Sequence, residues 1–296
     1  MKISRVFAAI FLFVALSAGS ASGQLQAKQQ MKLGENAALR YWSAFAEMQD
    51  ASITSQQAQD LNLILNGKAP YEDLKYKNLV EKNEPALETM IRGTMLPDCD
   101  WGIDYQLGSD TPVEYVRKAL TLGRLNVLYV FHLLMNGDKN GAVRSLVAGL
   151  RFSHDVANGG TLFATEVAAS LINSHLRAVE FALHVGGLST EQRLALQGAV
   201  AGLGTNGLNW RSAIKRELDL YSSPDHHLDP QSLAAMSRIT PLYMDIVSDP
   251  SVLPRLQQMI ANAPQPVQEI MPNPQGVLES EQMLTQKLAE ARGMVQ

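Results

Sequence analysis

Three carboxylates lie close together in the segment 98–104 (DCDWGID) of this sequence of 296 residues. They belong to Asp98, Asp100 and Asp104. Carboxylate oxygens are calcium ligands, but the EF-hand loop needs glycine at its sixth position and glutamate at its twelfth. This chain has Ile103 and Ser109 there, so the template fails. We therefore interpret the segment as a connector in which the aspartates cap turns while Trp101 and Tyr105 pack.

Cys99 is the only cysteine in the sequence, which excludes an internal disulfide and any metal site built from several thiolates. Its immediate neighbours are Asp98 and Asp100. Two nearby negative charges should raise the pKa of the thiol, because they disfavour the thiolate. A raised pKa argues against a reactive nucleophile at this position.

Two adjacent histidines, His226 and His227, stand in the segment 225–229 (DHHLD). Adjacent side chains point in different directions in a helix or a strand, so at most one of the pair faces a given site. Pro224 and Pro230 flank the segment, which favours a surface turn. A zinc site is the alternative interpretation, but no third ligand follows at a recognised spacing.

Three further histidines, His132, His154 and His175, occupy three successive predicted helices. At 1.5 Å per residue, His132 lies about 6 Å from the turn at Asn136-Gly137, and His154 lies about 24 Å from it. These two therefore cannot share a metal ion. His175 is expected to return to the level of His132, far from His154. A shared His132–His175 site and a buried histidine with ordinary hydrogen-bond partners are both open interpretations.

Recognised catalytic and cofactor motifs are missing from the sequence. We find no glycine-rich phosphate loop, no G-x-S-x-G, no H-E-x-x-H and no C-x-x-C. We therefore predict no cofactor and no metal. The chain has 25 Lys and Arg against 29 Asp and Glu, a net charge of −4. Neither a basic stripe nor a polyacidic tail is present, so we expect no nucleic acid partner.

The N-terminus has the pattern of a secretory signal peptide in residues 1–23. Lys2 and Arg5 precede an apolar run at 6–16, and small residues at 21–23 predict cleavage before Gln24. Eleven helical residues rise only about 16 Å, too little to span a bilayer. The apolar segment 119–135 contains Arg124 and two further polar residues, and is better explained as a core helix. We expect an exported protein, periplasmic or secreted, with no stable membrane span after cleavage.

Helical periodicity dominates residues 24–222, which we predict to form a helical-hairpin core. Helix starts are indicated at Thr54, Asp138, Thr161 and Ser189, and Pro85 suits the first turn of another helix. Loops of two to four residues between long helices require antiparallel packing. The predicted fold class is therefore all-α, with stacked antiparallel helical hairpins forming a solenoid-like array or an irregular bundle.

Residues 223–296 form a proline-rich extension, with nine of the 13 prolines of the chain. We predict short helices at Leu233–Val247 and Val252–Asn262, then a linker at Ala263–Gln275 with little that could be buried. A final amphipathic helix follows Gly276. Its apolar stripe consists of Val277, Leu284, Leu288 and Ala291. Docking of this stripe on the core and binding of a partner are both open.

Several short motifs resemble those of a known group of proteins. They are Glu35-Asn36-Ala37-Ala38 with Tyr41, Cys99-x-Trp101 with Tyr105 and Gly108, and Arg117 and Arg124 before Gly137-Asp138. The region from Glu35 to Leu183 is similar to uncharacterised exported helical proteins of soil and aquatic bacteria. The resemblance implies a helical, exported protein and supplies no catalytic residue. Thr111-Pro112-Val113 departs from the Pro-His-Leu-like step expected there.

Two classes of function remain open. The favoured one is a non-catalytic binding or scaffold module, because helical hairpins create extended surfaces and no catalytic constellation is present. Its partner would be another exported protein or a component of the cell envelope. The alternative is a helical hydrolase or lyase acting on a polysaccharide or peptide outside the cytoplasm. A deep pocket with convergent carboxylates or histidines would favour the enzyme, and a shallow groove lined by apolar and amide side chains the binding module.

Overall fold

The computed structural model describes residues 34–49, 54–65, 68–110, 113–185, 187–222 and 228–296. The predicted signal peptide lies outside these residues. The described part of the chain is all-helical, as predicted, and its single strand-like feature is an isolated bridge between Asn36 and Asp98. The helices are α2 (Ala37–Glu47), α3 (Ser55–Leu65), α4 (Asp73–Gly93), α5 (Glu114–Met135), α6 (Lys139–Val156), α7 (Leu162–Val185), α8 (Thr190–Gly202), α9 (Trp210–Tyr221), α10 (Pro230–Asp245), α11 (Leu253–Ala261), α12 (Gln265–Ile270) and α13 (Pro274–Val295). Short 3-10 helices lie at Tyr105–Asp110, Ala157–Gly159 and Pro250–Val252.

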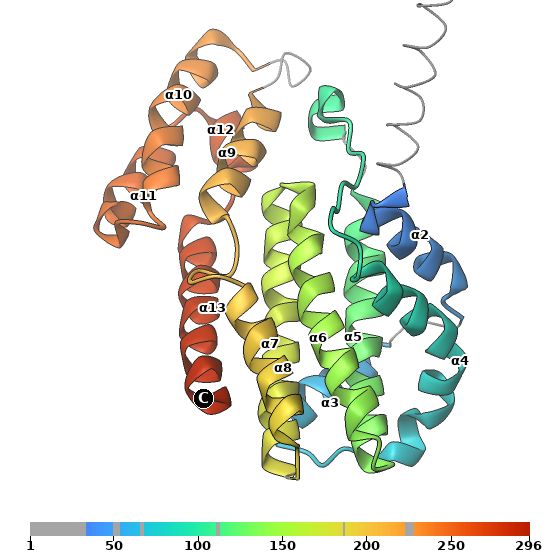
Figure 1. Cartoon of the computed structure of the whole chain (residues 1–296). Helices are drawn as coiled ribbons and strands as arrows, with labels where there is room; N and C mark the ends of the chain where they lie inside the picture. Colours follow the sequence, from blue (N-terminus) through green and yellow to red (C-terminus); the bar gives the residue numbers. More distant parts are fainter. Residues whose placement is uncertain (1–33, 50–53, 66–67, 111–112, 186, 223–227) are drawn as a thin grey trace, which may run out of the picture.

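Helices α5, α6 and α7 run up and down beside one another at the centre of the molecule (Figure 1). The turn between α5 and α6 is short because Gly137 takes a positive φ of 80° and Asp138 begins the next helix at once. The Asp138 carboxylate accepts the Gly141 N–H, and the Thr161 hydroxyl accepts the Ala164 N–H at the start of α7. These N-caps satisfy helix-end donors that would otherwise lack partners, which confirms both predicted starts.

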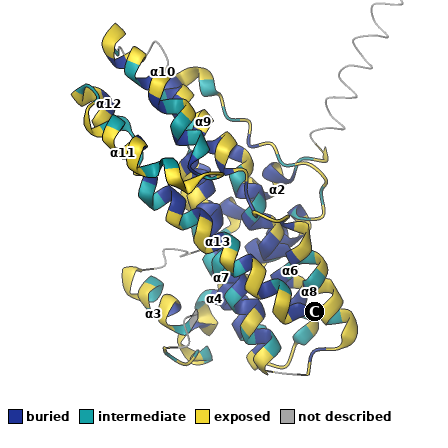
Figure 2. Cartoon of the chain, turned by 90° about the vertical axis from the view of Figure 1, so that its left-hand side faces the viewer, coloured by how far each residue is buried: buried dark blue, intermediate teal, exposed yellow. Residues whose placement is uncertain are grey.

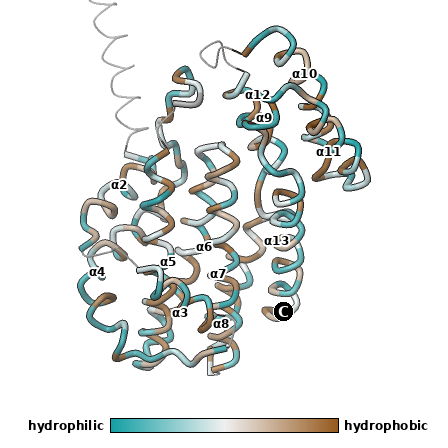
Figure 3. Tube along the Cα trace, turned by 180° about the vertical axis from the view of Figure 1, so that it is seen from behind, coloured by the Kyte–Doolittle hydropathy of each residue, from teal (hydrophilic) through white to brown (hydrophobic). Residues whose placement is uncertain are grey.

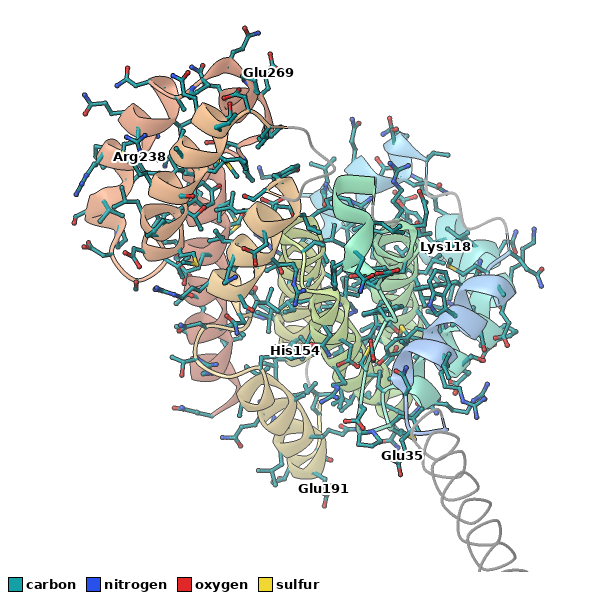
Figure 4. All side chains as sticks on the ribbon, turned by 90° about the horizontal axis from the view of Figure 1, so that it is seen from above. Glu35, Lys118, His154, Glu191, Arg238 and Glu269 are labelled. Carbon is teal, nitrogen blue, oxygen red and sulfur yellow. The ribbon has the colours of Figure 1, made fainter. Side chains whose placement is uncertain are left out.

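The outer helices cover the two flanks of this central trio. Helices α2 and α4 pack together on one side, and α13 packs against α7 on the other. Seen from above, Glu35 and Lys118 lie on one side of the molecule, and Arg238 and Glu269 lie toward the other (Figure 4). Buried residues gather along the central helices, whereas α3 is mostly exposed or half-buried (Figure 2). Apolar residues recur along the same central helices (Figure 3), and many of them are buried. The core therefore depends on α5–α7 and on what packs against them.

The expected helix start at Pro85 is wrong, because Pro85 lies inside α4. A proline inside a helix removes one backbone donor and disfavours the helix by about 3 kcal/mol. Packing offsets this cost here, since Val80 and Leu87 on either side of Pro85 are completely buried. The Asn83 side chain adds hydrogen bonds to the carbonyls of Gln49 and Leu79. Tertiary contacts thus keep α4 helical on both sides of Pro85, although local preference places proline in the first turn of a helix.

The C-terminal extension contains more helix than its prolines suggest. Helix α10 begins at Pro230, earlier than predicted, because Asp229 caps it by accepting the N–H groups of Gln231 and Ser232. The predicted linker contains α12, and Val267 of that helix is completely buried. Proline at the first helical positions costs little, since those N–H groups have no helical partner. The expectation that this segment buries little is therefore wrong.

The last helix docks on the core. Helix α13 packs against α7 and α8, and Val277, Leu284, Leu288 and Ala291 of its predicted stripe are all buried. Of the two alternatives for the apolar stripe, docking on the core and binding of a partner, the structure shows docking. Within the described residues, no helix combines the length and the apolar character that crossing a membrane requires.

Candidate binding groove along helix α7

Two of the three aspartates of the 98–104 segment make local turn contacts. The Asp100 carboxylate accepts the Gly102 N–H at 2.9 Å, and the Asp104 carboxylate accepts the Gln106 N–H at 3.0 Å. Asp98 contributes its backbone, whose carbonyl accepts the Ala37 N–H at 2.7 Å. These are the hydrogen bonds of a fixed connector, as predicted. Trp101 packs in it as expected, stacked on Tyr115 with ring centroids 4.2 Å apart.

A buried cluster around Asp155 joins this connector to α2 and α6. The completely buried Asp155 carboxylate accepts the Tyr41 hydroxyl at 2.7 Å and pairs with Arg151 at 3.1 Å. Its backbone carbonyl accepts the Trp101 indole N–H at 2.8 Å. Burial raises the pKa of the Cys99 thiol, and the charge of Asp155 adds to the rise. The direction expected for Cys99 is confirmed, but burial is the main cause and not its sequence neighbours. The cluster is held by the chain's own donors, so we assign it to structure.

His132 joins the end of α5 to the start of α4. Its Nδ1 lies 2.7 Å from a carboxylate oxygen of Asp73, and the Tyr71 hydroxyl donates to the same oxygen at 3.2 Å. The Asn136 side chain also lies against the imidazole ring. His132 is therefore engaged by residues at one end of the bundle.

His175 lies elsewhere, completely buried among α5, α6 and α7. Its Nδ1 donates to the Leu171 carbonyl at 2.8 Å, and its Nε2 lies 3.1 Å from the Asn126 amide nitrogen. The Ser153 hydroxyl is 3.2 Å from Nδ1. Asn126 is also bonded to Ser145, by both its oxygen and its nitrogen. We call Asn126, Ser145, Ser153 and His175 the buried polar network.

The expected level of His175 is wrong. His175 meets Asn126, which precedes His132 on α5 by six residues, or about 9 Å of helix. His154 directly follows Ser153, a neighbour of His175, so its backbone lies near the level of His175 and not far from it. One reason for the difference is that side chains in a helix point toward its N-terminus. The His175 ring therefore lies beside Leu171, one turn before its own backbone. His132 and His175 therefore form no common site.

The remaining candidates give no metal centre within the described residues. His226 and His227 lie outside them. Among the residues that the structure describes, no group of three or more His, Cys, Asp or Glu side chains is placed to hold a metal ion.

The structure instead brings together a groove that the sequence interpretation missed. A cavity of about 560 Å³ lies between α7, α9, α12 and α13, and a second of about 260 Å³ adjoins it toward α3. Both are lined by Glu166 and Ser280, so they meet at these residues. We call the two cavities together the α7 groove. The larger cavity alone has the size of a small-molecule site.

One stripe of α7 forms the floor of this groove. It consists of Phe163, Glu166, Ser170, Asn173 and Arg177, which line one cavity or the other. Their spacing of three and four residues places them on one face of the helix. None of the five is fully buried, although α7 packs against the core on its other faces. From Leu162 to Arg177 the helix rises about 22 Å, which is the length of α7 along the groove.

Two carboxylates mark the end of the groove near the start of α7. Glu217 on α9 accepts the Leu162 N–H at 3.0 Å and the Tyr221 hydroxyl at 3.1 Å. A carboxylate at a helix N-terminus is favourable, because it meets the positive end of the helix dipole. Glu166 lies one turn along α7, and its pKa is raised, first by desolvation in the groove and then by the charge of Glu217. Solvent still reaches Glu166 from the open side.

The other end of the groove carries Arg177 and a set of neutral polar groups. Among the described residues, neither Glu166 nor Arg177 forms an ion pair or a side-chain hydrogen bond. The Asn173 amide oxygen likewise has no hydrogen-bond partner in this part of the chain. Ser170, Ser174 and Ser280 complete the polar lining. Hydroxyls and amides both donate and accept hydrogen bonds, so this lining can meet a ligand with both kinds of group.

A signal for the groove is present in the sequence. The third long helix was recognised by its apolar residues, which include Val167, Leu171 and Leu176. The polar stripe runs along the same helix with the same period. Because the other faces of this helix are packed, a row of polar residues on it indicates a side that faces solvent or a ligand. Glu217 could not be found this way, because only the fold places α9 beside the start of α7.

The sequence matches no protein-family model, and neither the curated proteins nor the solved structures contain a match. The candidate site therefore rests on its geometry and chemistry.

Proposed function

We propose that this protein is an exported, non-catalytic binding module that holds an extended peptide in the α7 groove. The observation that carries this proposal is the polar stripe of α7, which lines two adjoining cavities over about 22 Å of helix. An extended chain advances about 3.3 Å per residue, so a short peptide matches this length. Grooves of this kind are a common means by which helical proteins recognise segments of other chains.

The chemistry of the lining supports a peptide ligand. A peptide backbone offers alternating N–H and C=O groups, and the serine and asparagine side chains of the groove can bind both. Apolar contacts are available from Phe163, which is 43% exposed, and from Met283, which is 53% exposed. Such a mixture of amide, hydroxyl and apolar groups favours a binding module over an enzyme.

A hydrolase is the second candidate, and among the described residues it is supported by Glu166. A raised pKa keeps a carboxyl group protonated to higher pH, which suits a general acid. Glycoside hydrolysis, however, uses two free carboxyl groups. Glu217 already accepts hydrogen bonds from the α7 N-terminus and from Tyr221. Glu217 is thus engaged in holding the start of α7, and binding is the better proposal.

Export is part of the proposal because of the N-terminal sequence. A basic start, an apolar run of eleven residues and small residues before Gln24 are typical of a cleaved signal. Expression of the full sequence in a bacterium with a periplasm should give a processed protein outside the cytoplasm, with Gln24 as its first residue. An unprocessed protein confined to the cytoplasm would contradict this part of the proposal.

The groove itself is tested by filling it. Ser170 is exposed in the middle of the polar stripe and lines the smaller cavity, so Ser170→Trp should block the groove there without disturbing the core. Ser237→Trp is the matched control, because Ser237 is an exposed helical serine on α10 outside the groove. We would measure retention of a random pentapeptide library by equilibrium dialysis and mass spectrometry. Wild type and Ser237→Trp should retain a subset of the library, and Ser170→Trp should lose it.

Two outcomes would overturn the proposal. Equal retention by Ser170→Trp and wild type would place the ligand elsewhere. Cleavage of library members, abolished in Glu166→Gln while retention persists, would replace the binding module by the hydrolase.

A further inference from the structure

The charges of the α7 groove are separated along its length. Glu166, Glu217 and Arg177 are the charged residues that line the two cavities. The two carboxylates lie near the start of α7, and Arg177 lies eleven residues after Glu166 on the same helix. Between them the lining is neutral, with serine and asparagine side chains. The groove is therefore negative at one end and positive at the other.

We propose that the groove recognises both ends of a short peptide, with the free amino terminus at Glu166 and Glu217 and the terminal carboxylate at Arg177. This inference rests on the proposed function and adds the ligand's length, direction and end groups. The bound peptide would run in the same direction as α7. Its backbone would lie along the neutral part of the stripe, which a peptide's amide groups can satisfy.

The charged side chains at the two ends of the groove can bind the charged termini of a peptide. Glu166 and Arg177 form no ion pair or side-chain hydrogen bond among the described residues. The charge of Arg177 also acts on Glu290 of α13, whose pKa is lowered first by its hydrogen bond with Lys287. Glu217 faces Glu166 closely enough for its charge to act on that carboxyl group. A bound ammonium group would relieve the repulsion between the two, and Arg177 can bind a carboxylate through two parallel hydrogen bonds.

The spacing of the charges sets a length. Eleven helical residues rise about 16 Å between Glu166 and Arg177. An extended peptide covers that distance with about five residues at 3.3 Å each. A shorter peptide cannot reach both ends, and a longer one must leave one terminus outside or bend. Peptides of about five residues should therefore bind best.

Other ligand classes fit the charges less well. A polyamine carries positive charge at both ends and would place one of them against Arg177. A neutral oligosaccharide would use the hydroxyl and amide groups but neither charged end. Only a chain with opposite charges at its two ends meets both, and the unblocked peptide is the proposed case.

The test compares one random pentapeptide library in three forms, namely unblocked, N-acetylated and C-amidated, by isothermal titration and by retention. Removing one charge at an exposed ion pair should weaken binding about fivefold. Glu166→Gln should narrow the difference between the unblocked and acetylated libraries, because only the Glu217 charge remains, and Arg177→Gln should bind the unblocked and amidated libraries alike. Glu180→Gln is the matched control, because Glu180 is exposed on the same helix outside the groove. Unblocked tripeptides and octapeptides test the length.

The outcomes separate this inference from the proposed function. If all three forms bind equally, the groove takes peptides without reading their ends, and the inference is overturned while the proposed function stands. Equal affinity for unblocked tripeptides, pentapeptides and octapeptides would contradict the proposed length of about five residues. If no peptide is retained by wild type, both are overturned.

Discussion

His175 shows how a buried base is kept neutral. The Leu171 carbonyl can only accept a hydrogen bond, so the proton of the neutral ring lies on Nδ1. Nε2 is then free to accept from the Asn126 amide. A second proton on Nε2 would face that donor in a site without water-exposed surface. Burial accordingly lowers the pKa of His175 to about 4.

This pKa predicts a loss of stability in mild acid. In the unfolded chain a histidine has a pKa near 6.5, so below that pH the unfolded state gains a proton that the native state refuses. Stability from this group is complete above pH 6.5 and falls as the pH drops toward 4, by about 3 kcal/mol in all. Urea unfolding at pH 7 and pH 4.5 should show it. The drop should be smaller in His175→Gln and unchanged in His184→Gln, an exposed position on the same helix. An equal drop in all three proteins would contradict the assignment.

Gly149 lies against the buried polar network, which leaves no room for a side chain at this position. A Cβ atom there would lie 2.3 Å from His175 Nε2 and 2.5 Å from the Asn126 amide nitrogen. Gly149→Ala should therefore destabilise the protein by about 1–3 kcal/mol, although alanine is the better helix former. Gly198→Ala on α8 is the control, since nothing lies within 4 Å of a Cβ there and a gain of up to about 1 kcal/mol is expected. Thermal unfolding of both variants measures the difference, and equal melting temperatures would be inconsistent with close packing at Gly149.

Single residues also show what sequence can predict. The caps at Thr54 and Ser189 follow from groups three residues away, and both form the reciprocal bonds of a capping box. The partner of His132 is Asp73, which is 59 residues away and belongs to another helix. Nothing local specifies that pairing, so it could not be predicted.

At the scale of elements, α13 is the clearest case of a helix whose role depends on one face. Its apolar stripe predicted an amphipathic helix, and the structure places that stripe against α7 and α8. Gly207 is part of this contact, because a Cβ there would lie 2.8 Å from the Leu288 side chain. The helix also supplies Ser280 to the α7 groove, so its docking completes the candidate site.

Docking of α13 predicts a large effect at Leu288. This side chain is completely buried, so Leu288→Ala should cost about 2–5 kcal/mol of unfolding free energy through lost contacts and a cavity. Met294→Ala on the same helix should change stability by less than about 0.5 kcal/mol, because Met294 is 37% exposed. Urea titrations of the two variants give the comparison. A small effect at Leu288 would mean that α13 contributes little to the core.

Helix boundaries failed where packing outweighs local preference. Pro85 predicts a helix start, yet it lies within α4, where the completely buried Leu87 helps to hold the segment in the helix. Pro266 lies in the predicted linker, yet it occupies one of the first positions of α12, whose Val267 is completely buried. The free energy of that burial depends on residues far along the chain. Periodicity alone therefore finds the helices and misplaces some of their ends.

At the scale of the whole molecule, the all-helical class could be predicted, whereas the sequence carries only the α7 stripe of the groove. Helical periodicity is a local property, and it recurs along the sequence. The groove needs α3, α7, α9, α12 and α13 in their final places, since each of them contributes lining residues. Glu217 illustrates this, because its carboxylate meets the start of α7 from 55 residues further along the chain.

The hydrogen bond between Tyr41 and Asp155 has a consequence for the order in which the molecule folds. It spans 114 residues, and the Asn36–Asp100 pair beside it spans 64. The α5–α6 and α6–α7 hairpins close over short turns and can form early, since nearby segments meet faster than distant ones. The Tyr41–Asp155 hydrogen bond must wait for α6, although α2 itself packs chiefly on α4. We therefore expect the contact between Tyr41 and Asp155 to form last. A substitution that breaks it should speed unfolding and leave the folding rate nearly unchanged.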